Sequence, residues 1–225
     1  MSVTAPTAKD AILIVAHPDD EVLWFGGLLA EVSLVIMAFC DLASKPELGA
    51  QRRRAVGKLP FRCEMLGLPE AGTYWRADWE NPSLLRHGLQ LDFATPDVIT
   101  AYERNYRLLD ERLRPYLSAD TPVFTHNPWG EYGHEDHVQL NIVLRKLAAE
   151  LGFPLYVSGY CYPHAERLAA RFPEVRSRPV MSRSINLSYV RQVKSIYQEH
   201  DCWTWEVPDP WGDEDTYLQS ASASA

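Results

Sequence analysis

The chain has 225 residues, 46% of them hydrophobic, and carries a formal net charge of -8 with a pI near 5.4. This length allows one substantial core, and the acidic balance argues against nucleic-acid binding, which depends on basic side chains that contact phosphates. No apolar run approaches the roughly 20 residues that span a bilayer, and the first ten residues lack the apolar core of a signal peptide. We therefore expect a cytoplasmic protein without membrane insertion whose partners are small molecules.

Apolar patterning predicts the elements in chain order. The run AILIVA over residues 11–16 predicts a strand covered on both faces, as in a parallel sheet. After it, Asp19 or Asp20 can cap a helix that begins near Glu21, and a second strand is predicted over 33–40. The later expected elements are a helix over 50–67 that Pro60 should kink or split, an irregular stretch over 69–95, a helix over 97–115, a strand over 122–126, a helix over 136–151, a strand over 155–162, and a helix over about 188–200 that leads into a Trp-rich tail.

This alternation of strands and helices implies a parallel sheet with right-handed crossovers. We expect an α/β fold, a Rossmann-like three-layer α/β/α arrangement with a mainly parallel sheet. Residues 11–219 should form a single domain between a disordered N-terminus over 1–10 and a disordered tail over 220–225. Ligands of such sheets bind beyond the carboxyl ends of the strands, so this edge is the expected place of the site.

Two polar clusters each follow a predicted strand directly. His17, Asp19 and Asp20 come after the first strand, and the sequence HNPWGEYGHEDH over residues 126–137 follows the strand predicted over 122–126. Because the carboxyl ends of parallel strands share one edge of the sheet, both clusters should rise from the same edge. Acids at a helix start can be simple caps, and histidines in a surface loop can be incidental, but two such clusters together favour a site.

The residue types in these clusters fit a divalent metal. A catalytic zinc site typically has three protein ligands and one open position, and two histidines with one carboxylate are a known combination. The residue types leave open whether Asp19 or Asp20 is bound, and whether His134 or His137 is. The carboxylate left free can take a proton from a metal-activated water and hand it to a leaving amine, so hydrolysis of an amide is the natural reaction class.

Together the motifs resemble a known family. AHPDDE over residues 16–21 after an apolar strand, and YGHEDH over residues 132–137 before a helix, are similar to the motifs of the PIG-L/LmbE family of zinc-dependent N-acetylglucosaminyl deacetylases, in an order and spacing that extend from about residue 11 to 200. The resemblance implies one deacetylase domain over 11–219. It implies a hydrolase that removes the N-acetyl or N-acyl group of a small amino-sugar glycoside through a zinc-activated water, releasing amine and carboxylate.

Carried over by position, the resemblance implies that His17, Asp20 and His137 bind zinc, and that Asp19 is the general base. A site with nitrogen and oxygen ligands would also accept iron or another divalent ion.

Three further roles follow from the same resemblance. His134 would stabilise the oxyanion of the tetrahedral intermediate, Asp136 would hold or tune His134, and Tyr132 matches a mobile tyrosine that assists. The chain departs from the family pattern at Glu135, where the family usually has proline. Pro60 also falls in a helix that the family commonly runs unbroken.

Substrate contacts are predicted on fewer grounds. Similar enzymes carry a substrate-binding arginine where this chain has three arginines over 52–54, and we take Arg53 as the candidate. Asp78, Trp75 and Trp79 could line a sugar pocket, because aromatic faces pack on sugar rings and carboxylates accept hydroxyl hydrogen bonds. The structural alternatives are a solvated basic helix face and core packing of the tryptophans.

Other functions compete with this interpretation. The same fold and mechanism would serve a longer N-acyl chain or a non-sugar amide. A nucleotide-binding domain without metal chemistry is disfavoured, because the first loop lacks G-x-G-x-x-G and places acids where a pyrophosphate would lie. A catalytically inactive relative would be expected to lose a ligand or the base, and this chain keeps them. The oligomeric state stays open, a homo-oligomer included.

Overall fold

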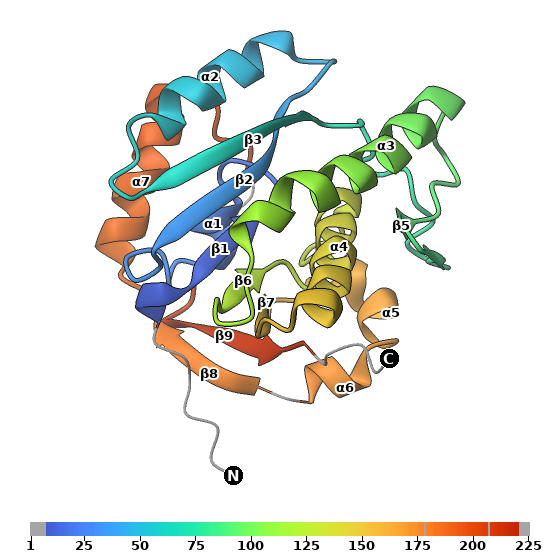
Figure 1. Ribbon diagram of the computed structural model, residues 1–225. Helices are drawn as coiled ribbons and strands as arrows, with labels where there is room; N and C mark the ends of the chain where they lie inside the picture. Colours follow the sequence, from blue (N-terminus) through green and yellow to red (C-terminus); the bar gives the residue numbers. More distant parts are fainter. Residues whose placement is uncertain (1–7, 178, 207, 221–225) are drawn as a thin grey trace.

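The computed structural model describes residues 8–220 except 178 and 207 (Figure 1). Within these residues, seven strands form one sheet in the order β3-β2-β1-β6-β7-β9-β8. The strands are β1 (Ile12–Val15), β2 (Leu34–Asp41), β3 (Cys63–Pro69), β6 (Val123–Thr125), β7 (Leu155–Ser158), β8 (Pro179–Ser184) and β9 (Glu214–Gln219). The first five are parallel to one another, whereas β9 is antiparallel to both β7 and β8.

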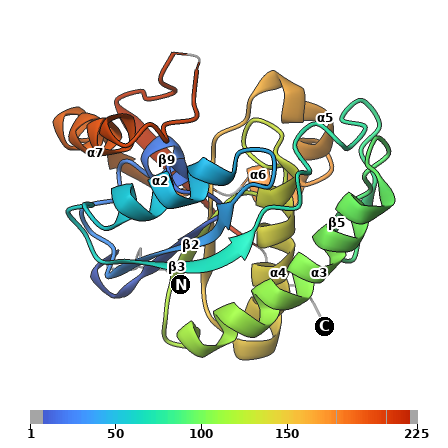
Figure 2. The ribbon, with the colours of Figure 1, turned by 90° about the horizontal axis from the view of Figure 1, so that it is seen from above.

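Helices cover both faces of the sheet (Figures 1 and 2). On one side lie α1 (Asp20–Trp24), α2 (Pro46–Val56) and α7 (Leu187–Glu199), and on the other lie α3 (Pro96–Leu113) and α4 (Glu135–Leu151). The predicted α/β fold with a mainly parallel sheet is confirmed. Among the described residues, no helix is both long and apolar enough to cross a membrane.

The central strands explain why both faces are covered. Leu13 and Val15 of β1 belong to the hydrophobic cluster that includes α2 and α7, and Ile12 and Ile14 belong to the cluster that includes α3 and α4. Successive side chains of a strand point to opposite faces. An apolar run without alternation is therefore buried on both sides, as the sequence of β1 predicts.

Two segments differ from their predicted structure. The helix expected over 50–67 is wrong in its second half, because α2 ends at Val56 and residues Cys63–Pro69 form β3. Parallel pairing with β2 outweighs the helix-forming residues of CEMLGLP. Pro60 lies between the two elements, so the predicted segment is split there and not kinked. Strands β8 and β9 were not predicted, since the polar sequence EDTYLQ of β9 becomes a strand through its pairing with β7 and β8.

The remaining described elements are short. The irregular stretch predicted over 69–95 contains only the two-residue strands β4 (Leu84–Leu85) and β5 (Gly88–Leu89). The others are α5 (Glu166–Ala169), α6 (Pro173–Arg176) and the 3-10 turns η1 (Ala8–Asp10), η2 (Arg114–Tyr116) and η3 (Pro163–Ala165).

The ends of the predicted domain lie slightly further out than expected. Residues 8–10, expected to be disordered, form a 3-10 turn. Ser220, also expected to be disordered, is buried, and its N–H donates to the carbonyl of Leu155. The rest of the two segments predicted to be disordered, 1–7 and 221–225, lies outside the described residues.

The turn after α1 packs closely on β8 at Gly27. A Cβ placed on Gly27 would lie 2.7 Å from the backbone oxygen of Arg183, and the Gly27 N–H donates to Oδ2 of Asp215 at 2.8 Å. We therefore expect Gly27→Ala to lower the free energy of unfolding by about 1–3 kcal/mol, because the turn and the sheet edge must move apart. Urea denaturation would measure this change.

Gly57→Ala is the matched control. Its Cβ would meet nothing nearer than 3.5 Å in a right-handed helical backbone, with φ -67°, so its effect should stay within about 0.5 kcal/mol. Equal free energies of unfolding of the two variants would show that β8 can move away from residue 27 without loss of stability.

Candidate functional site

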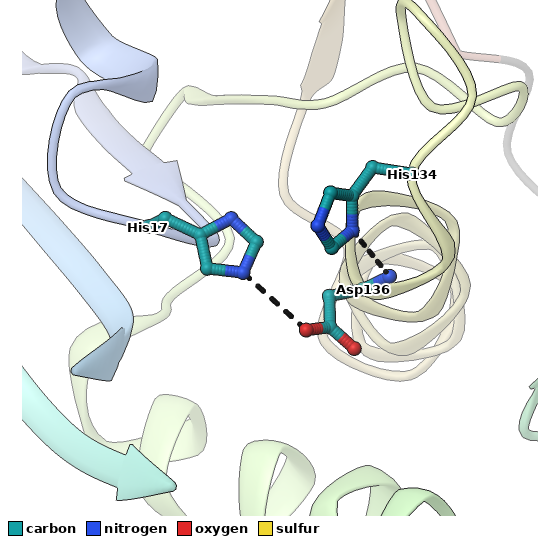
Figure 3. A group of neighbouring side chains, drawn as sticks. All are labelled: His17, His134 and Asp136. Carbon is teal, nitrogen blue, oxygen red and sulfur yellow. Dashed lines mark hydrogen bonds and ion pairs between the residues drawn. The ribbon is translucent and has the colours of Figure 1, made fainter. Parts of the chain in front are cut away.

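The neighbouring strands β1 and β6 bring the two polar clusters together. His17, Asp19 and Asp20 follow β1, and the loop after β6 leads to His134 and Asp136 at the start of α4. All five side chains are buried despite their polarity. Figure 3 shows His17 and Asp136 facing each other across the gap between the two loops, with 3.3 Å between His17 Nε2 and Asp136 Oδ2.

The predicted ligands His17, Asp20 and His137 form one compact group of donor atoms. Asp20 Oδ2 lies 3.2 Å from His17 Nδ1 and 3.2 Å from His137 Nε2. The donor atoms of the three residues all lie within 4.8 Å of one another. His137 Nε2 is buried and makes no hydrogen bond to the described residues. A buried nitrogen without a partner, next to a carboxylate and a second imidazole, fits a divalent cation.

Asp20 is suited to stay ionised in this group. Burial alone would raise the pKa of Asp20, but the positive charge of His137 and His126 in their protonated forms outweighs burial and holds the pKa of Asp20 well below its ordinary value. Its other oxygen, Oδ1, accepts a hydrogen bond from Trp24 Nε1 at 3.2 Å. The carboxylate is thereby oriented with Oδ2 toward the imidazoles.

Glu131 orients two histidines and was given no role in the sequence analysis. Its Oε2 lies 3.0 Å from Nδ1 of His126 and 2.9 Å from Nδ1 of His137. A carboxylate bonded to Nδ1–H leaves Nε2 deprotonated and directed at the metal position. The sequence shows a carboxylate in the same loop as these histidines, but the contact depends on a turn with left-handed backbone at Gly130 (φ 70°) and at Glu131 itself (φ 54°).

His126 links the two loops. The backbone N–H of Ala16, at the end of β1, donates to His126 Nε2 at 2.9 Å. That nitrogen therefore acts as an acceptor, and the ring proton lies on Nδ1, facing Glu131. The donor atoms of His126, Glu131 and His137 also lie within 4.8 Å of one another, but hydrogen bonds to Ala16 and Glu131 already use both ring nitrogens of His126.

The predicted base Asp19 does not cap the helix that follows it. Asp19 has a left-handed backbone (φ 105°) and makes no side-chain capping bond to α1. Instead its Oδ2 accepts hydrogen bonds from the hydroxyl of Thr204 at 2.6 Å and from the Thr204 N–H at 3.2 Å. Burial and the neighbouring Asp20 raise the pKa of Asp19 to about 6. Thr204 lies 185 residues from Asp19, in the Trp-rich segment, so no local sequence pattern indicates this contact.

His134 is held as a neutral imidazole. The backbone N–H of Asp136 donates to His134 Nδ1 at 3.2 Å, as Figure 3 shows, so the ring proton lies on Nε2. Burial and the charge of His17 lower the pKa of His134 well below its ordinary value. Asp136 hydrogen-bonds to His134 through its backbone amide. Its carboxylate faces His17 and accepts a hydrogen bond from the Thr73 hydroxyl at 2.8 Å.

His17, Asp19, Asp20 and His134 line a cavity of about 740 Å³. The ring of Tyr132 lines it, with its centroid 5.9 Å from that of His134 and 5.5 Å from that of His137, in edge-on contacts. The predicted base Asp19, the predicted oxyanion donor His134 and the predicted assisting tyrosine Tyr132 therefore all line one cavity.

The structure places the two predicted substrate contacts away from the cavity. Arg53 points outward and pairs with Asp41, whereas the preceding Arg52 is buried in the cavity wall and pairs with Glu70. Consecutive helical residues point about 100° apart, so only one arginine of the run can face inward. Asp78 is half-buried and accepts the backbone N–H of Asn81 in a local turn.

The departure at Glu135 has a structural role. Glu135 is buried, and its Oε1 accepts the backbone N–H groups of Arg76 and Ala77 at 2.9 Å each and the Trp79 Nε1–H at 3.2 Å. Burial raises the pKa of Glu135 to about 7. This carboxyl fastens the irregular stretch to the start of α4, and Trp79 is consequently buried instead of lining the cavity.

Comparison with known proteins agrees with these motifs. The family model PIG-L, described as GlcNAc-PI de-N-acetylase, matches residues 12–148. A 1D-myo-inositol 2-acetamido-2-deoxy-alpha-D-glucopyranoside deacetylase 1 of Saccharopolyspora erythraea is 29% identical over 179 residues, which are 67% of this chain and 56% of the relative. Such a deacetylase of Mycobacteroides abscessus is 30% identical over 163 residues, 61% of this chain and 54% of the relative. The chain spans little more than half the length of these curated relatives.

Solved structures show the same fold. The zinc-inhibited form of teicoplanin deacetylase Orf2 superposes with a TM-score of 0.56 at 15% identity, covering 93% of this chain and 97% of that one. A deacetylase–teicoplanin complex gives a TM-score of 0.55 at the same identity and coverage. The family model matches residues 12–148, more than half of this chain, so the chain belongs to the PIG-L family.

Proposed function

We propose that this protein is a metal-dependent deacetylase that hydrolyses the N-acetyl or N-acyl amide of an N-acetylglucosamine-type glycoside. The observation that carries the proposal is the buried, unbonded Nε2 of His137 beside Asp20 and His17. Asp19 lines the same cavity as His17 and Asp20. The names of the relatives support the substrate class, since they are deacetylases of 2-acetamido-2-deoxyglucopyranosides.

His17, Asp20 and His137 would hold the metal, with Nδ1, Oδ2 and Nε2 as the ligand atoms. A divalent ion bound there, zinc or iron, would polarise the amide carbonyl and lower the pKa of a water molecule. Glu131 supports this role, because its carboxylate keeps the Nε2 lone pair of His137 free.

Asp19 would act as the general base. Its Oδ2 accepts hydrogen bonds from Thr204, whereas its Oδ1 accepts none from the described residues. The Asp19 side chain lines the cavity. Oδ1 would accept the proton of the attacking water and return it to the amine nitrogen as the C–N bond breaks. A carboxyl with a pKa of about 6 suits both transfers, because it is mostly ionised at neutral pH and yet holds a proton briefly.

His134 would stabilise the negative charge that develops on the amide oxygen. Its Nε2–H is the available donor, since Nδ1 is engaged by the amide of Asp136. A neutral donor fixed in advance needs no reorganisation when the charge appears. Tyr132, which packs edge-on against this ring, would contribute its hydroxyl from the cavity side.

The alternative substrates, a longer N-acyl chain or a non-sugar amide, would use the same residues. Amine release from N-acetylglucosamine glycosides, N-octanoylglucosamine and a simple N-acetyl amine would rank the three classes directly.

We expect Asp19→Asn to lower kcat by at least about 100-fold, because the amide accepts no proton from water at neutral pH. Metal content, measured by elemental analysis, should stay that of the parent. Asp78→Asn is the control for the same substitution at a carboxyl outside the cavity, and it should leave amine release unchanged. Parent-like turnover of Asp19→Asn would refute the assignment of the base.

We expect Glu131→Gln to weaken metal binding by about 10–100-fold, because an amide no longer fixes the Nδ1 protons of His126 and His137. Competition with a chromogenic chelator would measure the affinity. Glu64→Gln, at a carboxyl on the edge strand β3, should bind the metal as the parent does. An unchanged affinity of Glu131→Gln would remove Glu131 from the metal site.

We expect Thr204→Val to lower kcat about tenfold, the effect of losing one hydrogen bond to a charged carboxylate. KM and metal content should not change, since Thr204 lies outside the proposed ligand group. Thr204→Ser keeps the hydroxyl and should retain most of the activity. Equal kcat of the valine and serine variants would show that the hydroxyl does not position Asp19.

A further inference from the structure

Exposed aromatic side chains gather at the mouth of the cavity. Tyr74, Trp75 and Tyr162 are 49%, 55% and 52% exposed, and all three line the cavity. Among the described residues, seven large hydrophobic side chains are exposed, so nearly half of them surround this one opening. A local concentration of exposed apolar surface marks a ligand site more often than chance exposure.

The backbone holds Trp75 in an unusual conformation. Its φ is 60°, in the left-handed region that residues with a side chain rarely adopt. The next two residues, Arg76 and Ala77, donate their N–H groups to the buried carboxylate of Glu135. Strain of this kind persists only where surrounding contacts impose it, and it clusters at functional positions.

The indole itself is supported from one side. The ring of His164 packs against Trp75 with centroids 4.2 Å apart. More than half of the side chain nonetheless stays accessible. The residue is thus fixed by its backbone and its neighbour while its remaining surface stays open, which is the arrangement of a preorganised binding residue.

Tyr74 connects this indole to the reacting centre. Its ring stacks on the ring of His134, with centroids 5.0 Å apart and planes 17° apart, and meets Trp75 edge-on at 5.8 Å. The rings therefore run without interruption from the proposed oxyanion donor to the cavity mouth. Trp75 lies one ring further from the reacting amide than Tyr74 does.

We propose that Trp75, with Tyr74, forms a platform for a second ring of the substrate, attached to the amino sugar whose amide is cleaved. This inference rests on the proposed function. The ring would present a flat apolar face, as an aromatic aglycone or a further sugar does, because aromatic side chains pack on such faces. The cavity, about 740 Å³, is of the size that encloses drug-sized ligands, so it has room beyond one amino sugar.

The experiment compares three substrates: N-acetylglucosamine, its naphthyl glycoside, and a disaccharide in which N-acetylglucosamine is linked to glucose. For Trp75→Ala we expect KM to rise about fivefold to tenfold with the substrate whose second ring uses the platform. The kcat should be unchanged, and the monosaccharide should show the parental KM. Trp75→Phe, which keeps an aromatic face, should recover most of the affinity.

Phe93→Ala is the matched control, since Phe93 is 62% exposed in the same irregular stretch and does not line the cavity. It should behave as the parent with all three substrates. The substrate whose KM rises more in Trp75→Ala, the naphthyl glycoside or the disaccharide, identifies the kind of second ring. A KM that Trp75→Ala leaves unchanged for both, or raises equally for the monosaccharide, overturns the platform.

Failure of the proposed function would look different, because the parent would then release no amine from any of these substrates. Calorimetric titration of parent and Trp75→Ala with the same naphthyl glycoside and disaccharide still decides the platform in that case. Weaker binding of one ligand to the variant supports it, and equal or undetectable binding of both ligands to the two proteins overturns it.

Discussion

The candidate site depends on the parallel pairing of β1 with β6. This pairing places the ends of two strands that are more than a hundred residues apart in the chain next to each other, and the hydrogen bond from Ala16 N–H to His126 Nε2 fastens one loop to the other. Asp20 from the first loop then meets His137 from the second. The same pairing requires apolar strands covered on both faces, so the core and the site have one origin.

Burial of many acids in so small a volume needs compensation. Asp19, Asp20, Glu131 and Asp136 are all nearly inaccessible to solvent, and buried charges are costly unless they are paired. Imidazoles supply part of the pairing, as Glu131 does with two histidines. A divalent cation at the His17, Asp20 and His137 group would compensate further charge, and the electrostatics of the fold and the proposed chemistry thus favour the same ligand.

Residues beyond the region matched by the family model complete the cavity. The match ends at residue 148, yet Thr204 contacts the carboxylate of Asp19. Trp205 packs edge-on against Trp24 and Tyr132 with centroids 5.3 Å and 5.2 Å away. The motifs within the matched region therefore supply the proposed ligands and the proposed base, whereas segments beyond that region help to shape the space around them. Substrate choice is the property that such segments would set.

The sequence by itself determined the sheet's central strands, the two polar clusters and their shared edge. AILIVA is apolar without alternation, and HPDDE and YGHEDH are local motifs that follow strands directly, so neighbouring residues carry the whole signal. Tertiary structure decided what depends on distant partners. Strands β3 and β9 exist through pairing with neighbours, Arg52 instead of Arg53 faces the cavity because of how α2 lies on the sheet, and Thr204 reaches Asp19 across 185 residues. Such contacts leave no periodic or local pattern, because their energy arises only once the chain has folded.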